Sequence, residues 1–98
     1  MNYAVWKYPL PDKINPLTMP LEARPLSLQM QDGVPTLWAL VDTSTGMVER
    51  TYCFYDTGET LPGGPKNSMF WRYAGTLQFP NGTVYHLFDV TGLEADDE

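Results

Sequence analysis

The segment that decides the fold class is Thr36–Asp42, with the sequence TLWALVD. It is apolar at nearly every position, as expected of a central strand buried on both faces. Turn sequences bound it on both sides: Asp32-Gly33, a strong hairpin signal, precedes it, and Thr43–Gly46 follows it. The segment therefore predicts a strand held between two tight antiparallel connections.

Similar signals fill the rest of the chain. Nine prolines are spread along it, and no proline-free stretch has the apolar period of a helix. Alternation places Leu26, Leu28 and Met30 on one face of their strand, and Pro25, which lacks an N–H group, places the start of that strand at a sheet edge. The predicted strands are Ala4–Leu10, Leu17–Met19, Ala23–Gln31, Thr36–Asp42, Met47–Thr57, Asn67–Phe79 and Thr83–Val90. We therefore predict an all-β fold, a small antiparallel barrel or sandwich of about six or seven strands.

The length and charge of the chain limit its organisation and its partners. With 98 residues it has the size of one domain, and we predict a single β domain over residues 1–91 and a disordered acidic tail over 92–98. The formal charge is −6, but the last five positions hold four of the twelve acidic residues, which leaves eight acidic and six basic residues elsewhere. This near balance argues against binding of duplex nucleic acid.

The N-terminal residues lack the apolar run of a signal peptide, and no apolar stretch has the length of a membrane span. We therefore expect a cytoplasmic protein without a membrane partner.

The residues of catalytic chemistry are few. Cys53 and His86 are the only cysteine and the only histidine, so we predict no metal site, no cofactor and no enzymatic activity. Cys53 lies among aromatic residues and should behave as a small hydrophobe. His86 falls on an apolar strand face, which fits a core histidine whose ring nitrogens bind backbone groups; a ligand-facing role is the alternative.

Aromatic side chains give the main indication of binding. The sequence has thirteen Trp, Tyr and Phe residues, too many for so small a core, so some rings should lie on the surface or in an oligomer interface. Arg50 and Arg72 each stand within two positions of a tyrosine. This combination is typical of interfaces and of nucleotide pockets. The long Gly58–Lys66 connection is either a lid or a plain crossover. The candidate ligand-binding residues are Trp38, Arg50, Tyr55, Thr57, Arg72, Tyr73 and His86.

The chain resembles a family of small proteins of undefined function that tailed bacteriophages and prophages encode. The resemblance starts at Trp6–Leu10 (WKYPL) and is strongest over Gln29–Asp42 (QMQDGVPTLWALVD). It continues through the loop Tyr55–Pro62 (YDTGETLP) and through Tyr73–Gln78 (YAGTLQ) and His86–Asp89 (HLFD). The resemblance implies a phage accessory protein that acts in the cytoplasm of the bacterial host.

The resemblance supplies no mechanism. Asp56 and Glu59 stand where the family has a glycine and a histidine, which makes a catalytic role of this loop less expected. We predict stoichiometric binding: a homo-oligomer that sequesters a nucleotide-derived immune signal and so opposes host defence. Two alternatives stay open, a protein–protein inhibitor of a host defence enzyme and a minor virion or assembly protein.

Overall fold

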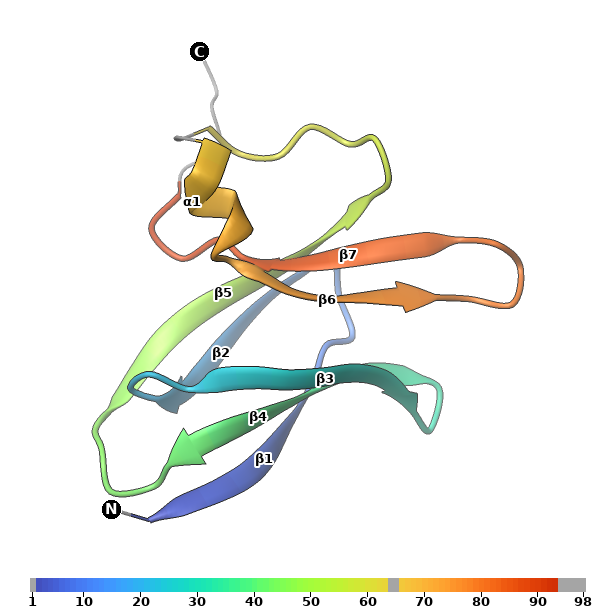
Figure 1. Ribbon diagram of the computed structural model, residues 1–98. Helices are drawn as coiled ribbons and strands as arrows, with labels where there is room; N and C mark the ends of the chain where they lie inside the picture. The colour runs from blue at the N-terminus through green and yellow to red at the C-terminus, as the bar shows by residue number, and fades with distance from the viewer. Residues whose placement is uncertain (1, 64–65, 94–98) are drawn as a thin grey trace.

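The computed structural model describes residues 2–63 and 66–93 and shows an all-β sandwich (Figure 1). A three-stranded antiparallel sheet has the order β1-β4-β3, and a four-stranded antiparallel sheet has the order β2-β5-β7-β6. The elements are β1 (Tyr3–Pro9), β2 (Ile14–Pro20), β3 (Arg24–Gln31), β4 (Val34–Asp42), β5 (Met47–Asp56), α1 (Lys66–Phe70), β6 (Tyr73–Gln78) and β7 (Val84–Asp89). The predicted all-β class is confirmed, in its sandwich form, because the sheets do not close into a barrel. Of the predicted acidic tail, 92–98, residues 94–98 lie outside the described residues.

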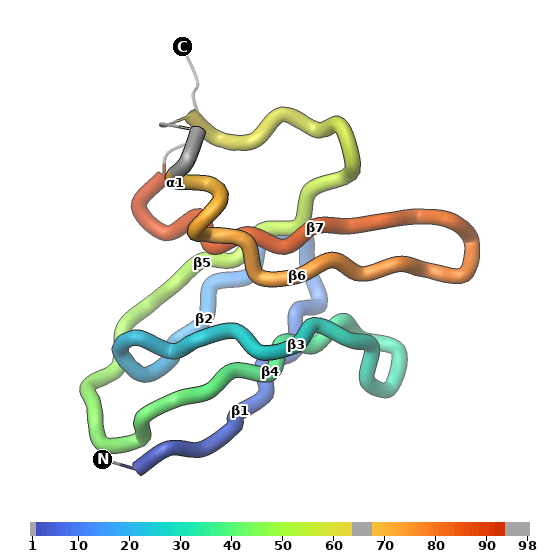
Figure 2. Tube along the Cα trace, in the orientation of Figure 1, coloured from blue at the N-terminus to red at the C-terminus, as the bar shows by residue number. Residues whose placement is uncertain are grey.

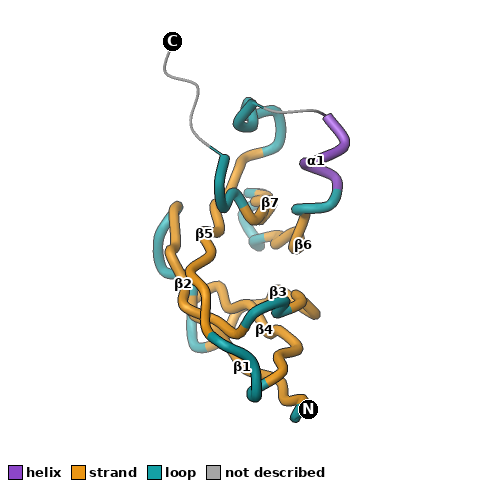
Figure 3. The backbone as a smooth tube through the Cα atoms, turned by 90° about the vertical axis from the view of Figure 1, so that its left-hand side faces the viewer, coloured by secondary structure: helices purple, strands orange, loops and turns teal. Residues whose placement is uncertain are grey.

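The segment TLWALVD is the central strand of its sheet, β4, as predicted. Its inward residues Leu37, Ala39 and Val41 are fully buried. Its outward residues Trp38 and Leu40 are only half-buried, so the expectation of burial on both faces is wrong. The reason is that the three-stranded sheet is an outer layer of the molecule (Figure 3).

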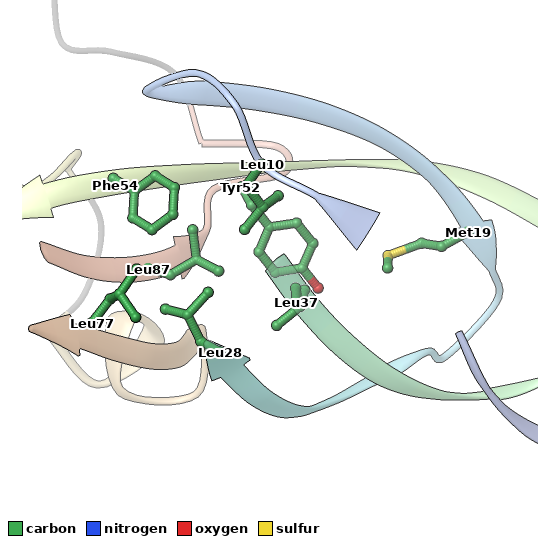
Figure 4. Close-up of a cluster of buried hydrophobic side chains, with 8 residues drawn as sticks. All are labelled: Leu10, Met19, Leu28, Leu37, Tyr52, Phe54, Leu77 and Leu87. Carbon is green, nitrogen blue, oxygen red and sulfur yellow. The ribbon is translucent and has the colours of Figure 1, made fainter. Parts of the chain in front are cut away.

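The hydrophobic core lies between the two sheets (Figure 4). Burial of each large apolar side chain there contributes roughly 1.5–3 kcal/mol to folding. The cluster consists of Leu10, Met19, Leu28, Leu37, Tyr52, Phe54, Leu77 and Leu87. In β5 the opposite face is buried as well, because the segment after this strand leaves the sheet and passes over it toward α1 (Figure 2).

The two sheets approach each other most closely where β3 faces β6. A β-bulge between Pro25 and Ser27 makes Leu26 an extra residue in β3, and Leu26 is consequently exposed. The predicted shared face is therefore wrong for Leu26 and holds for Leu28 and Met30, which follow each other in regular register, although Met30 is exposed. The edge position of the strand is confirmed. Leu28 packs against β6 where Gly75, at φ +149°, leaves room for it.

Two further boundaries differ from the prediction. The strand expected at Leu17–Met19 is longer, because β2 is a sheet edge where the missing N–H groups of Pro16 and Pro20 are tolerated. The strand expected from Asn67 starts only at Tyr73, because α1 occupies the first part of that segment. This helical turn buries Met69 and leaves Phe70 exposed. Across residues 2–63 and 66–93, no helix has the length and apolarity needed to cross a membrane.

Candidate functional site

Two predicted arginines meet at the C-terminal end of β7. Arg50 donates from Nη1 to Oδ2 of Asp89 over 3.0 Å. Arg72 donates from Nη1 to the backbone carbonyls of Asp89, at 3.1 Å, and Thr91, at 2.9 Å. Asp89 and its neighbours thus hold both guanidinium groups at one place, although Arg50 and Arg72 belong to different segments of the chain.

The sheet pairing explains this convergence. The N-terminal part of β5 extends past the end of β7. The last pair between the two strands is Tyr52 with Asp89, and Arg50 lies two residues before Tyr52. The chain enters β6 alongside the same residue, and the Asp89 N–H donates to the Arg72 carbonyl over 2.9 Å. Oδ1 of Asp89 accepts hydrogen bonds from the backbone N–H and the hydroxyl of Thr91. One carboxylate therefore fixes the turn with Oδ1 and Arg50 with Oδ2.

The two arginines line an open cleft of about 460 Å³ together with Ser68, Trp71, Asp89 and Thr91. The indole of Trp71 is 80% exposed, whereas the Arg50 side chain is 28% exposed. The Arg50 Nε atom is buried and has no hydrogen-bond partner within the described part of the chain. Two guanidinium groups against one carboxylate give these lining residues a net positive charge in a protein whose total charge is −6.

A buried tyrosine lies close to this charge cluster. Burial first, and then the negative charge of Asp89, raise the pKa of Tyr52 to about 12, while the positive charge of Arg50 acts in the opposite direction. Tyr52 therefore stays neutral at physiological pH. Among the residues that the structure describes, the charges that line the cleft are those of the two arginines and Asp89.

A second set of predicted residues forms a hydrogen-bond chain on the outer face of the four-stranded sheet. His86 Nε2 lies 2.7 Å from the Thr57 hydroxyl, and Nδ1 lies 3.0 Å from the Thr76 hydroxyl. The Tyr73 hydroxyl bonds to the same Thr76 oxygen. His86 is half-buried, and threonine hydroxyls rather than backbone groups engage its nitrogens, so the predicted backbone contact is wrong. This chain links the first loop residue after β5 to β7 and β6.

Aromatic rings accompany this hydrogen-bond chain. Phe88 makes edge-to-face contacts with Tyr55 at 6.1 Å and with Tyr73 at 5.6 Å between ring centroids. Burial raises the pKa of Tyr55. Its side chain lies on the face of the sheet where Pro62, in the loop after β5, lies close by. Cys53 is buried, and its Sγ contacts the Phe54 carbonyl at 3.6 Å. Since hydroxyls occupy both His86 nitrogens, we assign this cluster the role of anchoring the loop.

The remaining predicted residue, Trp38, is on neither site. It belongs to the three-stranded sheet, where it pairs in register with Lys7 and Ser27. Trp71 is absent from the predicted ligand-binding residues, although it lines the cleft. The turn that follows α1 brings Trp71 and Arg72 to the same cleft. The sequence signal that could have identified Trp71 as a cleft residue is its position next to Arg72.

The described residues, 2–63 and 66–93, contain no group of three or more His, Cys, Asp or Glu side chains able to hold a metal ion. The protein is therefore an all-β sandwich with an arginine- and tryptophan-lined cleft at one end of its larger sheet. The chain belongs to the DUF7352 family, a domain of unknown function, whose sequence profile matches residues 1–97. No curated protein and no solved structure matches the chain.

Proposed function

We propose that the protein acts by stoichiometric binding of a nucleotide-derived anion in the cleft between Arg50, Arg72 and Trp71. The observation that carries this proposal is the convergence of two guanidinium groups beside an exposed indole. Guanidinium groups bind phosphate oxygens through paired hydrogen bonds, and an indole stacks on any nucleobase. No other place among the described residues combines two arginines with an aromatic ring.

The dimensions and charges of the cleft agree with a small ligand. Its volume of about 460 Å³ lies within the range of roughly 300–1,000 Å³ that is usual for small-molecule sites. The buried Arg50 Nε has no hydrogen-bond partner among the described residues, which costs about 1–3 kcal/mol, and a shift of this partly exposed side chain toward the cleft would let a ligand acceptor satisfy it. Asp89 limits the excess of positive charge, which favours a ligand of low negative charge over a long polyanion.

The resemblance to phage proteins gives this binding its proposed setting. We place the protein in the cytoplasm of an infected bacterium, where it sequesters a nucleotide-derived signal of a defence system without chemical conversion. Such a role requires only affinity and abundance. The hydrogen-bond chain through His86 and the two arginine contacts to backbone carbonyls fit a preformed binding protein.

The free side of β1 supports the oligomeric part of the proposal. Within the described part of the chain β1 is an edge strand that pairs only with β4, and its Val5 side chain is 56% exposed. An edge of this kind is a template for pairing with a second copy. Light scattering after size exclusion should give a mass of at least two chains, and Val5→Lys should reduce it; a monomeric wild type would refute this part.

A second function, inhibition of a host protein, is favoured by the exposed ring pair Phe70 and Trp71. The two rings are 73% and 80% exposed and pack edge-to-face with centroids 5.3 Å apart. Aromatic side chains on a surface commonly anchor protein interfaces. A pull-down from host lysate separates the two functions, because a stoichiometric protein partner supports inhibition, whereas retained nucleotide supports sequestration.

The test of the proposed function is calorimetry against cyclic di- and trinucleotides and cyclic ADP-ribose isomers. We expect one of them to bind, and Trp71→Ala to weaken that binding about fivefold or more, since stacking contributes about 1–3 kcal/mol per base. Trp6→Ala is the matched control, because Trp6 is an exposed tryptophan of β1, in the other sheet, and does not line the cleft. Absence of heat with every nucleotide refutes the proposal, as does equal loss of binding in both variants.

A further inference from the structure

We propose a second ligand site, for a small flat organic cation, at the end of β7 opposite to the arginine cleft. A pocket of about 350 Å³ opens there between the ends of the two sheets and contains Phe54, Phe79 and Tyr85 in its wall. Tyr85 lies near the start of β7 and Asp89 at its end, about 13 Å apart at roughly 3.3 Å per residue. The site is independent of the proposed nucleotide site.

Three aromatic rings form the apolar interior of this pocket. Tyr85 packs edge-to-face against Phe54, at 6.1 Å between ring centroids, and against Phe79, at 5.6 Å. Phe54 belongs to the hydrophobic core and is 7% exposed, whereas Phe79 and Tyr85 are half-buried. These contacts fix the orientation of the rings and so of their π faces. A π face attracts a cation more strongly when water is excluded from the contact.

Two aspartates give the mouth of the pocket its charge. Asp12 and Asp56 line the pocket, and both are exposed. Their backbone positions are fixed, because the Asp12 N–H donates to Asn15 Oδ1 over 3.1 Å and the Asp56 N–H donates to Glu59 Oε1 over 2.9 Å. Among residues 2–63 and 66–93, no hydrogen bond or ion pair engages either aspartate carboxylate.

The one cation that lines the pocket is already neutralised. Lys13 forms an ion pair with Glu59 at 3.0 Å, donates to the Phe54 carbonyl over 2.8 Å and lies 5.1 Å from the centroid of the Tyr55 ring. The mouth therefore keeps the negative charges of Asp12 and Asp56. These charges repel phosphates and attract positive groups.

Size and charge together define the ligand class. The volume is near the lower end of the range for small-molecule sites, so it suits a single ring system rather than a nucleotide. The ring interior requires a flat apolar body, and the two carboxylates at the mouth require a cationic group at one end of that body. An amidinium or ammonium group on an aromatic ring meets both requirements.

The test uses benzamidine as the probe and benzoate, of the same shape and opposite charge, as its comparison. We expect benzamidine to shift the amide NMR signals of Tyr85 and Phe79 in a saturable titration, and benzoate to leave them in place. Asp56→Asn should weaken benzamidine binding roughly twofold to fivefold, the effect of one exposed opposite charge. Asp12→Asn should act in the same direction.

Glu22→Gln is the matched control. Glu22 is an exposed carboxylate that precedes β3, at the end of that strand opposite to the β3–β4 turn, and it does not line the pocket. This variant loses the same charge far from the pocket and should bind benzamidine as the wild type does. Equal binding of benzoate, signal shifts outside the pocket, or unchanged affinity in both Asp12→Asn and Asp56→Asn would each overturn the proposal. Each of these results leaves the arginine cleft unaffected.

Discussion

Replacement of Gly75 by alanine tests how closely the two sheets approach each other. A Cβ atom at this position would lie 2.9 Å from Cβ and 3.4 Å from Cδ2 of Leu28. The nearest atom is fixed to the β3 backbone, so no side-chain rotation can move it away. Overpacking of this kind costs about 1–3 kcal/mol. The φ of +149° adds about 1–3 kcal/mol of backbone strain for any residue other than glycine.

The two contributions predict that Gly75→Ala destabilises the protein by roughly 2–6 kcal/mol, a large share of the 5–15 kcal/mol typical of a domain. Urea unfolding followed by circular dichroism measures this loss. Gly82→Ala is the control, since Gly82 also has a positive φ, +92°, but an added Cβ there meets nothing within 4 Å. The reasoning is refuted if Gly75→Ala costs no more than Gly82→Ala.

Three other predictions concern titration and surface exposure. Because the folded state keeps the Tyr52 proton up to about pH 12 and the unfolded chain loses it near pH 10, stability should fall by roughly 3 kcal/mol over that interval, and Tyr52→Phe should reduce the fall in alkaline unfolding curves. The Ser44 hydroxyl and N–H both hold the pKa of Asp42 below its usual value, so Ser44→Ala, which removes the hydroxyl alone, should raise that pKa in an NMR titration; an unchanged pKa would show that the hydroxyl bond is absent in solution. Trp71→Ala should change the unfolding free energy by less than about 0.5 kcal/mol, since its side chain is exposed, and a larger loss would assign Trp71 a structural role.

Local patterns predicted much of the fold. The apolar run Thr36–Asp42 and the turns on both sides of it led directly to β4 and its neighbours. Alternation in Met47–Asp56 predicted a strand but not the burial of both its faces, because the second cover comes from the loop after β5. The bulge at Leu26 also escaped prediction, since it depends on the partner strand rather than on the sequence around it.

The candidate site was predictable only in part. Arg50 and Arg72 could be singled out from their aromatic neighbours, but their meeting at Asp89 depends on β7 lying between β5 and β6. That order results from packing between distant segments. Thr57 and His86 come together through the pairing of β5 with β7 for the same reason. Strand order was the missing information in both cases.

The most direct test of the binding site observes the arginine Nε–H signals by NMR during titration with the nucleotide that gives the largest heat in calorimetry. The chain has three arginines, and Arg24 is an internal control, because it lines a neighbouring hollow that shares Trp71 with the cleft but contains neither Arg50 nor Arg72. The account predicts that the Arg50 and Arg72 signals shift at saturation while that of Arg24 stays. Binding that moves Arg24 alone, or none of the three, would contradict it.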